Sequence, residues 1–271
     1  SKAGLKATGF GILETFIFLQ PQVYPMTIVA HKFKEIRLDG GTVLNGFPTA
    51  GLVSTIVANY LIGALDLDQV GALDSDDFPP VSMVYANKPK FPARIYADKR
   101  LKLAVFLSEF TPPPFLARPI ARTMFSYAKE TGAERIIAPE VIGWVHGDET
   151  EPHVFGVGST DRTRAEMKRL SIKPFRQGMI AGITGVLLNE GRRAGVDVTS
   201  LIVETRPEMP DARAAARVLE AVNRLLPHLE IDVEPLYDQA ERIETRIKEM
   251  REQAKEMAER MQPTYPSELY R

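Results

Sequence analysis

The chain has 271 residues, of which 44% are hydrophobic and 25% charged, and a net charge of −1. This apolar content suffices for a sizeable core and excludes a wholly disordered protein. The near-neutral charge provides no global basic field, so neither nucleic acid nor an anionic membrane is an expected partner. Cysteine is absent, which excludes disulfides, thiol catalysis and cysteine metal sites, and fits a reducing cytoplasm.

No stretch reaches the roughly 18 to 20 apolar residues that a membrane-spanning helix needs. The apolar segment at residues 9–19 is short, is interrupted by Glu14 and lacks a secretory cleavage site. We therefore expect a soluble, cytoplasmic protein, and we assign no structure to residues 1–25.

Between residues 26 and 233, short β-branched runs alternate with amphipathic stretches. The runs predict strands at Thr42–Asn45, Gln69–Leu73, Val81–Tyr85, Arg94–Ala97, Leu101–Leu107, Arg135–Pro139 and Ser200–Glu204. Helices are predicted at Gly51–Leu65, Phe115–Thr131, Arg162–Leu170, Phe175–Ala194 and Ala212–Leu226. Runs such as Leu103–Leu107 are apolar throughout, which is typical of strands buried on both faces of a parallel or mixed sheet. The alternation of strands and helices predicts an α/β sandwich, whose strand order cannot be read.

Residues 234–262 carry the most regular pattern in the chain. Apolar or small residues recur at spacings of three and four: Leu236, Ala240, Ile243, Ile247, Met250, Ala254, Met257 and Met261. Such an a/d seam over more than three heptads predicts a helix that pairs with another copy of the chain. An amphipathic helix lying on its own domain is the alternative.

Two glycine-rich turns could bind phosphate through backbone N–H groups. The first, Asn45–Ser54, lacks both the P-loop lysine and the Rossmann spacing, so a tight turn that lets strand and helix pack closely is favoured. In the second, Gly156–Asp161, Ser159, Thr160 or Asp161 could equally cap the following helix.

The other candidates for chemistry are weak. His31, His146, His153 and His228 show no metal-ligand spacing, although His146 lies near several carboxylates. The stiff loop at residues 108–114 contains three successive prolines and could be a pocket wall or a contact surface. We find no set of nucleophile, base and orienting residue, and we predict no cofactor and no metal.

Three segments carry a resemblance to a known family: Leu44–Val53, Ala58–Leu61 and Val70–Pro80. They resemble the proteasome assembly chaperones, and more narrowly their archaeal homologues. The stretches Ile136–Gly143 and Gly178–Leu188 are similar to later parts of that family. The resemblance implies a three-layer α/β sandwich with a mixed, mostly parallel sheet, akin to nucleoside phosphorylases but used for binding, without catalysis.

The last three residues, Leu269, Tyr270 and Arg271, match the hydrophobic–Tyr–any residue (HbYX) motif. The resemblance implies that this motif docks between α-subunits of the proteasome core particle. A terminal carboxylate can be captured by a lysine, a tyrosine supplies a rigid ring with a hydroxyl, and a leucine buries apolar area. Tails presented together by an oligomer bind far better than a single tail.

We therefore divide the chain into an α/β domain at 1–233, a helical segment at 234–262 and a tail at 263–271. The leading hypothesis is a homo-oligomeric proteasome assembly chaperone or ATP-independent activator. The alternative is a nucleoside- or nucleotide-handling enzyme that would use both glycine-rich turns as phosphate cradles, with Glu140 or His146 as acid or base.

Overall fold

The computed structural model describes residues 28–144, 151–205 and 209–242. The strands are β1 Val29–Lys32, β2 Thr42–Gly46, β3 Asp68–Asp74, β4 Met83–Tyr85, β5 Lys88–Lys90, β6 Ala93–Asp98, β7 Leu103–Ser108, β8 Arg135–Gly143, β9 Val154–Gly158, β10 Lys173–Pro174 and β11 Asp197–Thr205. The helices are α1 Val53–Ala64, α2 Ala117–Thr131, α3 Asp161–Arg169, α4 Gly182–Ala194 and α5 Ala212–Leu225. Short 3₁₀ turns lie at Ala50–Leu52, Pro114–Leu116 and Pro227–Leu229.

Nine of these strands form one mixed sheet in the order β1-β3-β6-β7-β2-β8-β11-β9-β10. Its centre, β7-β2-β8-β11, is parallel throughout. The pairs β1–β3, β3–β6, β6–β7 and β11–β9 are antiparallel, whereas β9–β10 is parallel. Five of the nine strands therefore run in one direction, as predicted for a mixed, mostly parallel sheet.

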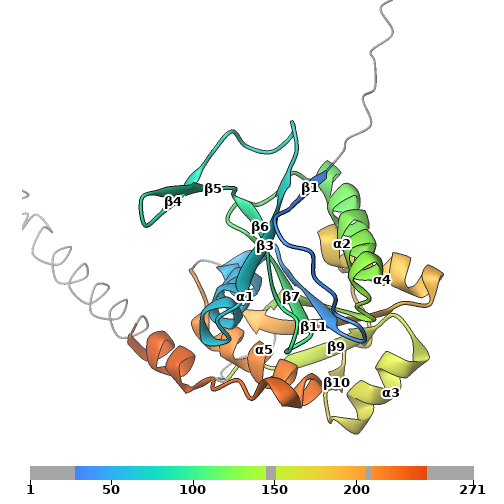
Figure 1. Ribbon diagram of the computed structural model, residues 1–271. Coiled ribbons are helices and arrows are strands. Elements are labelled where there is room, and N and C mark those ends of the chain that lie inside the picture. The colour runs from blue at the N-terminus through green and yellow to red at the C-terminus, as the bar shows by residue number, and fades with distance from the viewer. Residues whose placement is uncertain (1–27, 145–150, 206–208, 243–271) are drawn as a thin grey trace, which may run out of the picture.

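Helices cover both faces of the sheet (Figure 1). α2 and α4 pack on one face over a core that includes Phe106, Ile120 and Leu187. α1 and α5 pack together on the other face, where Val57, Val105 and Leu219 share a second core. β2 and β11 are buried along their whole length, which explains their apolar runs. The predicted α/β sandwich is confirmed, and no helix of the described residues is long and apolar enough to cross a membrane.

Several elements differ from the sequence prediction. The expected strand Val81–Tyr85 is shorter and pairs only with β5, in a hairpin that projects from the main sheet (Figure 1). Helix α4 begins at Gly182 and not at Phe175, because the chain first adds β10 to the sheet edge and then turns through residues with positive φ at Gly178 and Gly182. β1, β5, β9 and β10 were missed, since these short strands lack a strong apolar alternation.

A buried ion pair connects this hairpin to the main sheet. Arg94, 2% exposed, places Nη2 2.8 Å from Oε1 of Glu109, and the Tyr85 hydroxyl donates to the same carboxylate oxygen. The Arg94 guanidinium also lies over the Tyr85 ring, 5.3 Å from its centroid. This network connects β4 to the body of the sheet although the two share no backbone ladder.

Residues 234–242 are helical and pack on the same chain. Leu236 and Ala240 are 2% and 3% exposed, and Leu236 belongs to the core beneath α1 and α5. The Tyr237 hydroxyl donates to Oε1 of Glu220 in α5 at 2.6 Å. The first two positions of the predicted seam are thus covered within the monomer, as in the alternative of a helix on its own domain. The remaining positions, from Ile243 to Met261, lie outside the described residues.

Candidate functional site

A pocket opens at the carboxyl ends of the central strands, where β2 and β8 diverge. The two strands pair only from Thr42–Arg135 to Leu44–Ile137, whereas β8 stays paired with β11 as far as Gly143. Pro139 comes two residues after the last β2 pair, where a residue without an N–H is tolerated in β8. The resulting cavity has a volume of about 460 Å³. Crevices of this kind are the usual ligand sites of open α/β sheets.

Five polar side chains line this carboxyl-end pocket: Asn45 from β2, Glu140 from β8, Thr184 from α4, and Thr49 and Thr111 from the loops that follow β2 and β7. Asn45 accepts the backbone N–H of Phe47 through Oδ1 at 3.2 Å. Glu140 accepts the N–H of Val141 through Oε1 at 3.1 Å. Burial raises the pKa of the Glu140 carboxyl, and hydrogen bonds from the Val141 N–H and the Thr184 hydroxyl oppose that rise.

The rest of the lining is the start of α4 and an apolar wall. Ala181 occupies the N-cap of α4 without a capping side chain. The wall comes from the 112–114 proline run and from Met179 and Ile180. The sequence left open whether the proline loop is a pocket wall or a contact surface, and the structure shows that it forms a wall.

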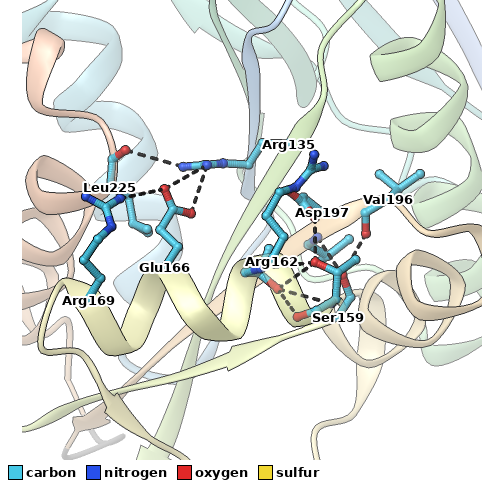
Figure 2. Close-up of polar contacts among 11 residues, drawn as sticks. Arg135, Ser159, Arg162, Glu166, Arg169, Val196, Asp197 and Leu225 are labelled. Carbon is cyan, nitrogen blue, oxygen red and sulfur yellow. Dashed lines mark hydrogen bonds and ion pairs between the residues drawn. The ribbon is translucent and has the colours of Figure 1, made fainter.

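A second pocket, of about 580 Å³, lies at the amino ends of the same strands. Several of its charged groups pair with one another (Figure 2). Arg135 of β8 lies 2.9 Å from Glu166 of α3. Asp197 of β11, which is 4% exposed, accepts from Arg162 Nε at 2.5 Å and from Thr160 Oγ1 at 2.6 Å. These contacts fasten α3 to the sheet.

The first glycine-rich turn, at Gly46–Gly51, lets β2 and α1 pack closely, in agreement with the favoured interpretation. A Cβ on Gly46 would lie 2.3 Å from Cβ of Ala58 in α1. Thr49 Oγ1 accepts the Ser54 N–H at 3.3 Å, and Ser54 Oγ donates to the Phe47 carbonyl at 2.5 Å. The side chains of the turn therefore supply hydrogen bonds at the start of α1.

The second turn caps a helix. Thr160 and Thr163 form a capping box at the start of α3. Ser159 Oγ donates to the Val196 carbonyl at 2.7 Å and accepts the Val198 N–H at 2.8 Å. Gly158 pairs with Thr199 at the amino end of β11, whereas Gly46 ends β2 at the opposite edge. The two turns therefore lie at opposite ends of the sheet and cannot hold the same phosphate group.

The described histidines have separate surroundings. His31 Nε2 lies 3.7 Å from Asp74, His153 Nδ1 lies 3.2 Å from Glu204, and His228 Nε2 lies 3.2 Å from the Leu101 carbonyl. His146 is outside the described residues. Among residues 28–144, 151–205 and 209–242, no three metal-ligating side chains form a cluster.

The predicted docking tail, Leu269, Tyr270 and Arg271, also lies outside the described residues. Reasoning from the sequence missed Thr184 as a pocket residue and named Asn45 only as the first residue of a glycine-rich turn. The available signal was that Asn45 closes a predicted buried strand of a sheet with a parallel centre, where ligand-binding side chains often gather.

Comparison with known proteins shows which family this chain resembles. The sequence model of the PAC2 family matches residues 43–251, which is most of the chain. The chain belongs to the PAC2 family. PbaA of Pyrococcus furiosus, described as an archaeal homolog of proteasome-assembly chaperone, is 33% identical, with a TM-score of 0.78 over 87% of this PAC2 chain and 96% of PbaA.

Two further relatives extend the comparison. PbaB of Pyrococcus furiosus, described as an archaeal proteasome activator, is 23% identical, with a TM-score of 0.71 over 83% of this chain and 99% of PbaB, and shares the fold. The uncharacterized protein MJ0106 of Methanocaldococcus jannaschii is 27% identical over 86% of this chain and 94% of its own length.

Proposed function

We propose that this PAC2 protein is a proteasome assembly chaperone or an ATP-independent proteasome activator. The observation that carries the proposal is the similarity to PbaA, at 33% identity over 87% of the chain. The structure is compatible with a binding role, because both glycine-rich turns are used for packing and capping. The carboxyl-end pocket leaves room for a small-molecule site beside that role.

The proposed contact with the core particle is the tail Leu269-Tyr270-Arg271. Tyr270 brings a rigid ring and a hydroxyl at low entropy cost, and Leu269 contributes on the order of 1.5–3 kcal/mol if fully covered. A carboxylate on Arg271 would pair with a lysine of the α-ring. One tail binds weakly, because association and ordering cost several kcal/mol.

Oligomerisation is the second element of the proposal. Leu236 and Ala240 are buried on their own domain, so an intermolecular seam would use the positions from Ile243 onward: Ile243, Ile247, Met250, Ala254 and Met257. Changing Ile247→Glu is then expected to lower the mass measured by light scattering. An unchanged mass would favour a helix that packs only within the chain.

Surface plasmon resonance on immobilised archaeal core particle tests the tail. Deleting residues 269–271, or making Tyr270→Ala, is expected to abolish binding while the oligomer mass stays the same. Tyr265→Ala is the matched control, because it removes the same ring from the same tail outside the motif. Adding one glycine after Arg271 displaces the carboxylate and should also abolish binding. Full binding by the Tyr270→Ala variant would disprove the docking mode.

The same complex separates a chaperone from an activator. The full-length protein is mixed with mature core particle, and complex formation and peptide hydrolysis are scored together. An activator accelerates hydrolysis without ATP, whereas a chaperone accelerates assembly of α-subunits and leaves hydrolysis by the mature particle unchanged. If neither assembly nor hydrolysis changes and no complex forms, the proposed function is wrong.

A further inference from the structure

The carboxyl-end pocket offers hydrogen-bond donors that the described residues do not use. Asn45 is 2% exposed, its Oδ1 is occupied by the Phe47 N–H, and its amide nitrogen donates to no described residue. α4 begins at Gly182 with no capping side chain. No described residue accepts the N–H groups of Gly182, Ile183 and Thr184, which open this 13-residue helix. One wall therefore favours an acceptor with negative charge.

The same pocket contains one acidic group. Glu140 accepts a hydrogen bond from the Val141 N–H, and no basic side chain of the described residues pairs with it. No lysine, arginine or histidine is among the residues that line the pocket. A multiply charged phosphate would find no countercharge there and would meet the Glu140 carboxyl, whereas an ammonium group would be attracted to it.

Apart from Thr49 and Thr111, the remaining surface is apolar. Pro113, Ile142, Met179 and Ile180 line the cavity, and Met179 is 90% exposed. The volume of about 460 Å³ is in the range of small-molecule sites. An apolar side chain can fill this part of the pocket while its polar end reaches Asn45, Glu140 and the start of α4.

From this arrangement we propose that the pocket binds a free apolar α-amino acid. The carboxylate accepts from the N–H groups at the start of α4 and from the Asn45 amide, the ammonium group donates to Glu140, and the side chain packs on the proline wall. The donors, the acid and the apolar wall then each have a partner. This inference is independent of the proposed proteasome function.

Each half of the ligand makes a different contact, so binding requires both halves. An ammonium on Glu140 alone would leave the N–H groups of α4 unused. A carboxylate alone would lie close to Glu140 without a neutralising partner. Burial raises the pKa of Glu140, and a bound ammonium would reverse that change.

The experiment is isothermal titration calorimetry on the full-length protein at neutral pH, with L-leucine, L-methionine and L-phenylalanine as probes. At least one is expected to bind with a Kd on the order of 1 mM or lower. For leucine, 4-methylpentanoate lacks the ammonium and 3-methylbutylamine lacks the carboxylate. The binding amino acid should exceed its two matched analogues by at least about tenfold.

Glu140→Gln tests the assignment of the acid. This variant keeps the shape of the side chain and should lose at least about tenfold in affinity for the amino acid. Glu134→Gln makes the same change at the exposed amino-end face of the sheet and should bind as the unchanged protein does. Thermal unfolding of both variants checks that they are folded.

The proposal is overturned if none of the three amino acids binds, or if an amine or a carboxylic acid alone binds as well as the amino acid. Equal affinity of the Glu140→Gln variant also overturns it. Inorganic phosphate is included as a fourth probe. Phosphate binding that strengthens in Glu140→Gln would identify an anion site in place of the proposed one.

Discussion

The two ends of the central sheet carry pockets of similar size and opposite character. At the amino end, Arg135, Arg162 and Asp197 satisfy one another or their neighbours across α3, β8 and β11 (Figure 2). At the carboxyl end, the amide nitrogen of Asn45 and the first N–H groups of α4 have no partner among the described residues, and Glu140 has no cationic one.

This difference shows that volume and charge do not by themselves identify a functional pocket. The amino-end pocket is the larger and has more charged residues, yet Arg135, Arg162 and Asp197 are used to hold α3 on the sheet. The carboxyl-end pocket has polar groups without partners, so a ligand can gain from them without breaking an existing contact.

The largest effect is expected where the carboxyl end is packed tightly. Gly46→Ala places a methyl group 2.3 Å from Cβ of Ala58 and 2.5 Å from the Phe106 carbonyl, so unfolding free energy should fall by about 3 kcal/mol. Gly63→Ala in α1 is the control, because its Cβ meets nothing within 4 Å, and it should stabilise the helix slightly. Urea denaturation measures both, and equal stability of the two variants would contradict the packing role.

The second-largest effect is expected in the amino-end pocket. Asp197→Ala removes the partner of Thr160 and Arg162 and should cost about 2 kcal/mol in urea denaturation. Asp161→Ala is the matched control in the first turn of α3, where the side chain is fully exposed. If both changes cost the same, the amino-end network does not fasten α3.

A smaller effect depends on pH. Tyr237→Phe removes the hydroxyl that donates to Glu220 and should cost about 1 kcal/mol at neutral pH. Burial and the Glu220 hydrogen bond raise the Tyr237 pKa from 10.0 to about 12. The stabilisation from this hydroxyl is therefore full below pH 10 and is lost as the pH rises toward 12.

Measured as the difference in unfolding free energy between the two proteins, the cost of Tyr237→Phe should shrink across that interval. A constant difference up to pH 12 would show that the hydroxyl is not held by Glu220. Using the difference cancels the other tyrosines, which titrate in both proteins.

The smallest effect on stability is expected for Glu140→Gln, which should make the folded protein slightly more stable. The pKa of Glu140 is raised from 4.5 by burial, so the ionised carboxyl destabilises the folded state at neutral pH. The variant should unfold at a slightly higher temperature at pH 7, with the advantage disappearing below the ordinary pKa of the acid. A variant less stable than the unchanged protein at pH 7 would show that the carboxylate is needed structurally.

The sequence was most informative where burial is uniform. The apolar run of β7 and the small-residue helix α5 were predicted within one or two residues, because both are buried by elements on either side. Pro210 and the N-cap Asp211 marked the start of α5. The strands β1 and β10 could not be predicted, since their side chains are mostly exposed and only backbone pairing defines them.

The carboxyl-end pocket was harder still. Glu140 was considered as an acid or base, but its neighbours Asn45 and Thr184 lie far away in the sequence and meet it only through the strand order β2-β8-β11 and the packing of α4. That order has no local signal. The distinction between used and unused polar groups likewise requires the hydrogen-bond partners of each atom.

The helix that begins at residue 234 is anchored to its own body by Leu236, Ala240 and Tyr237. In an assembly of several copies, the points from which the terminal segments depart would be spaced by contacts between the bodies. The spacing of the tails, which has to match the spacing of the sites on a ring-shaped partner, would then depend on residues far from those that touch the partner. Substitutions in the α/β domain could change this spacing and weaken attachment while every tail keeps its sequence.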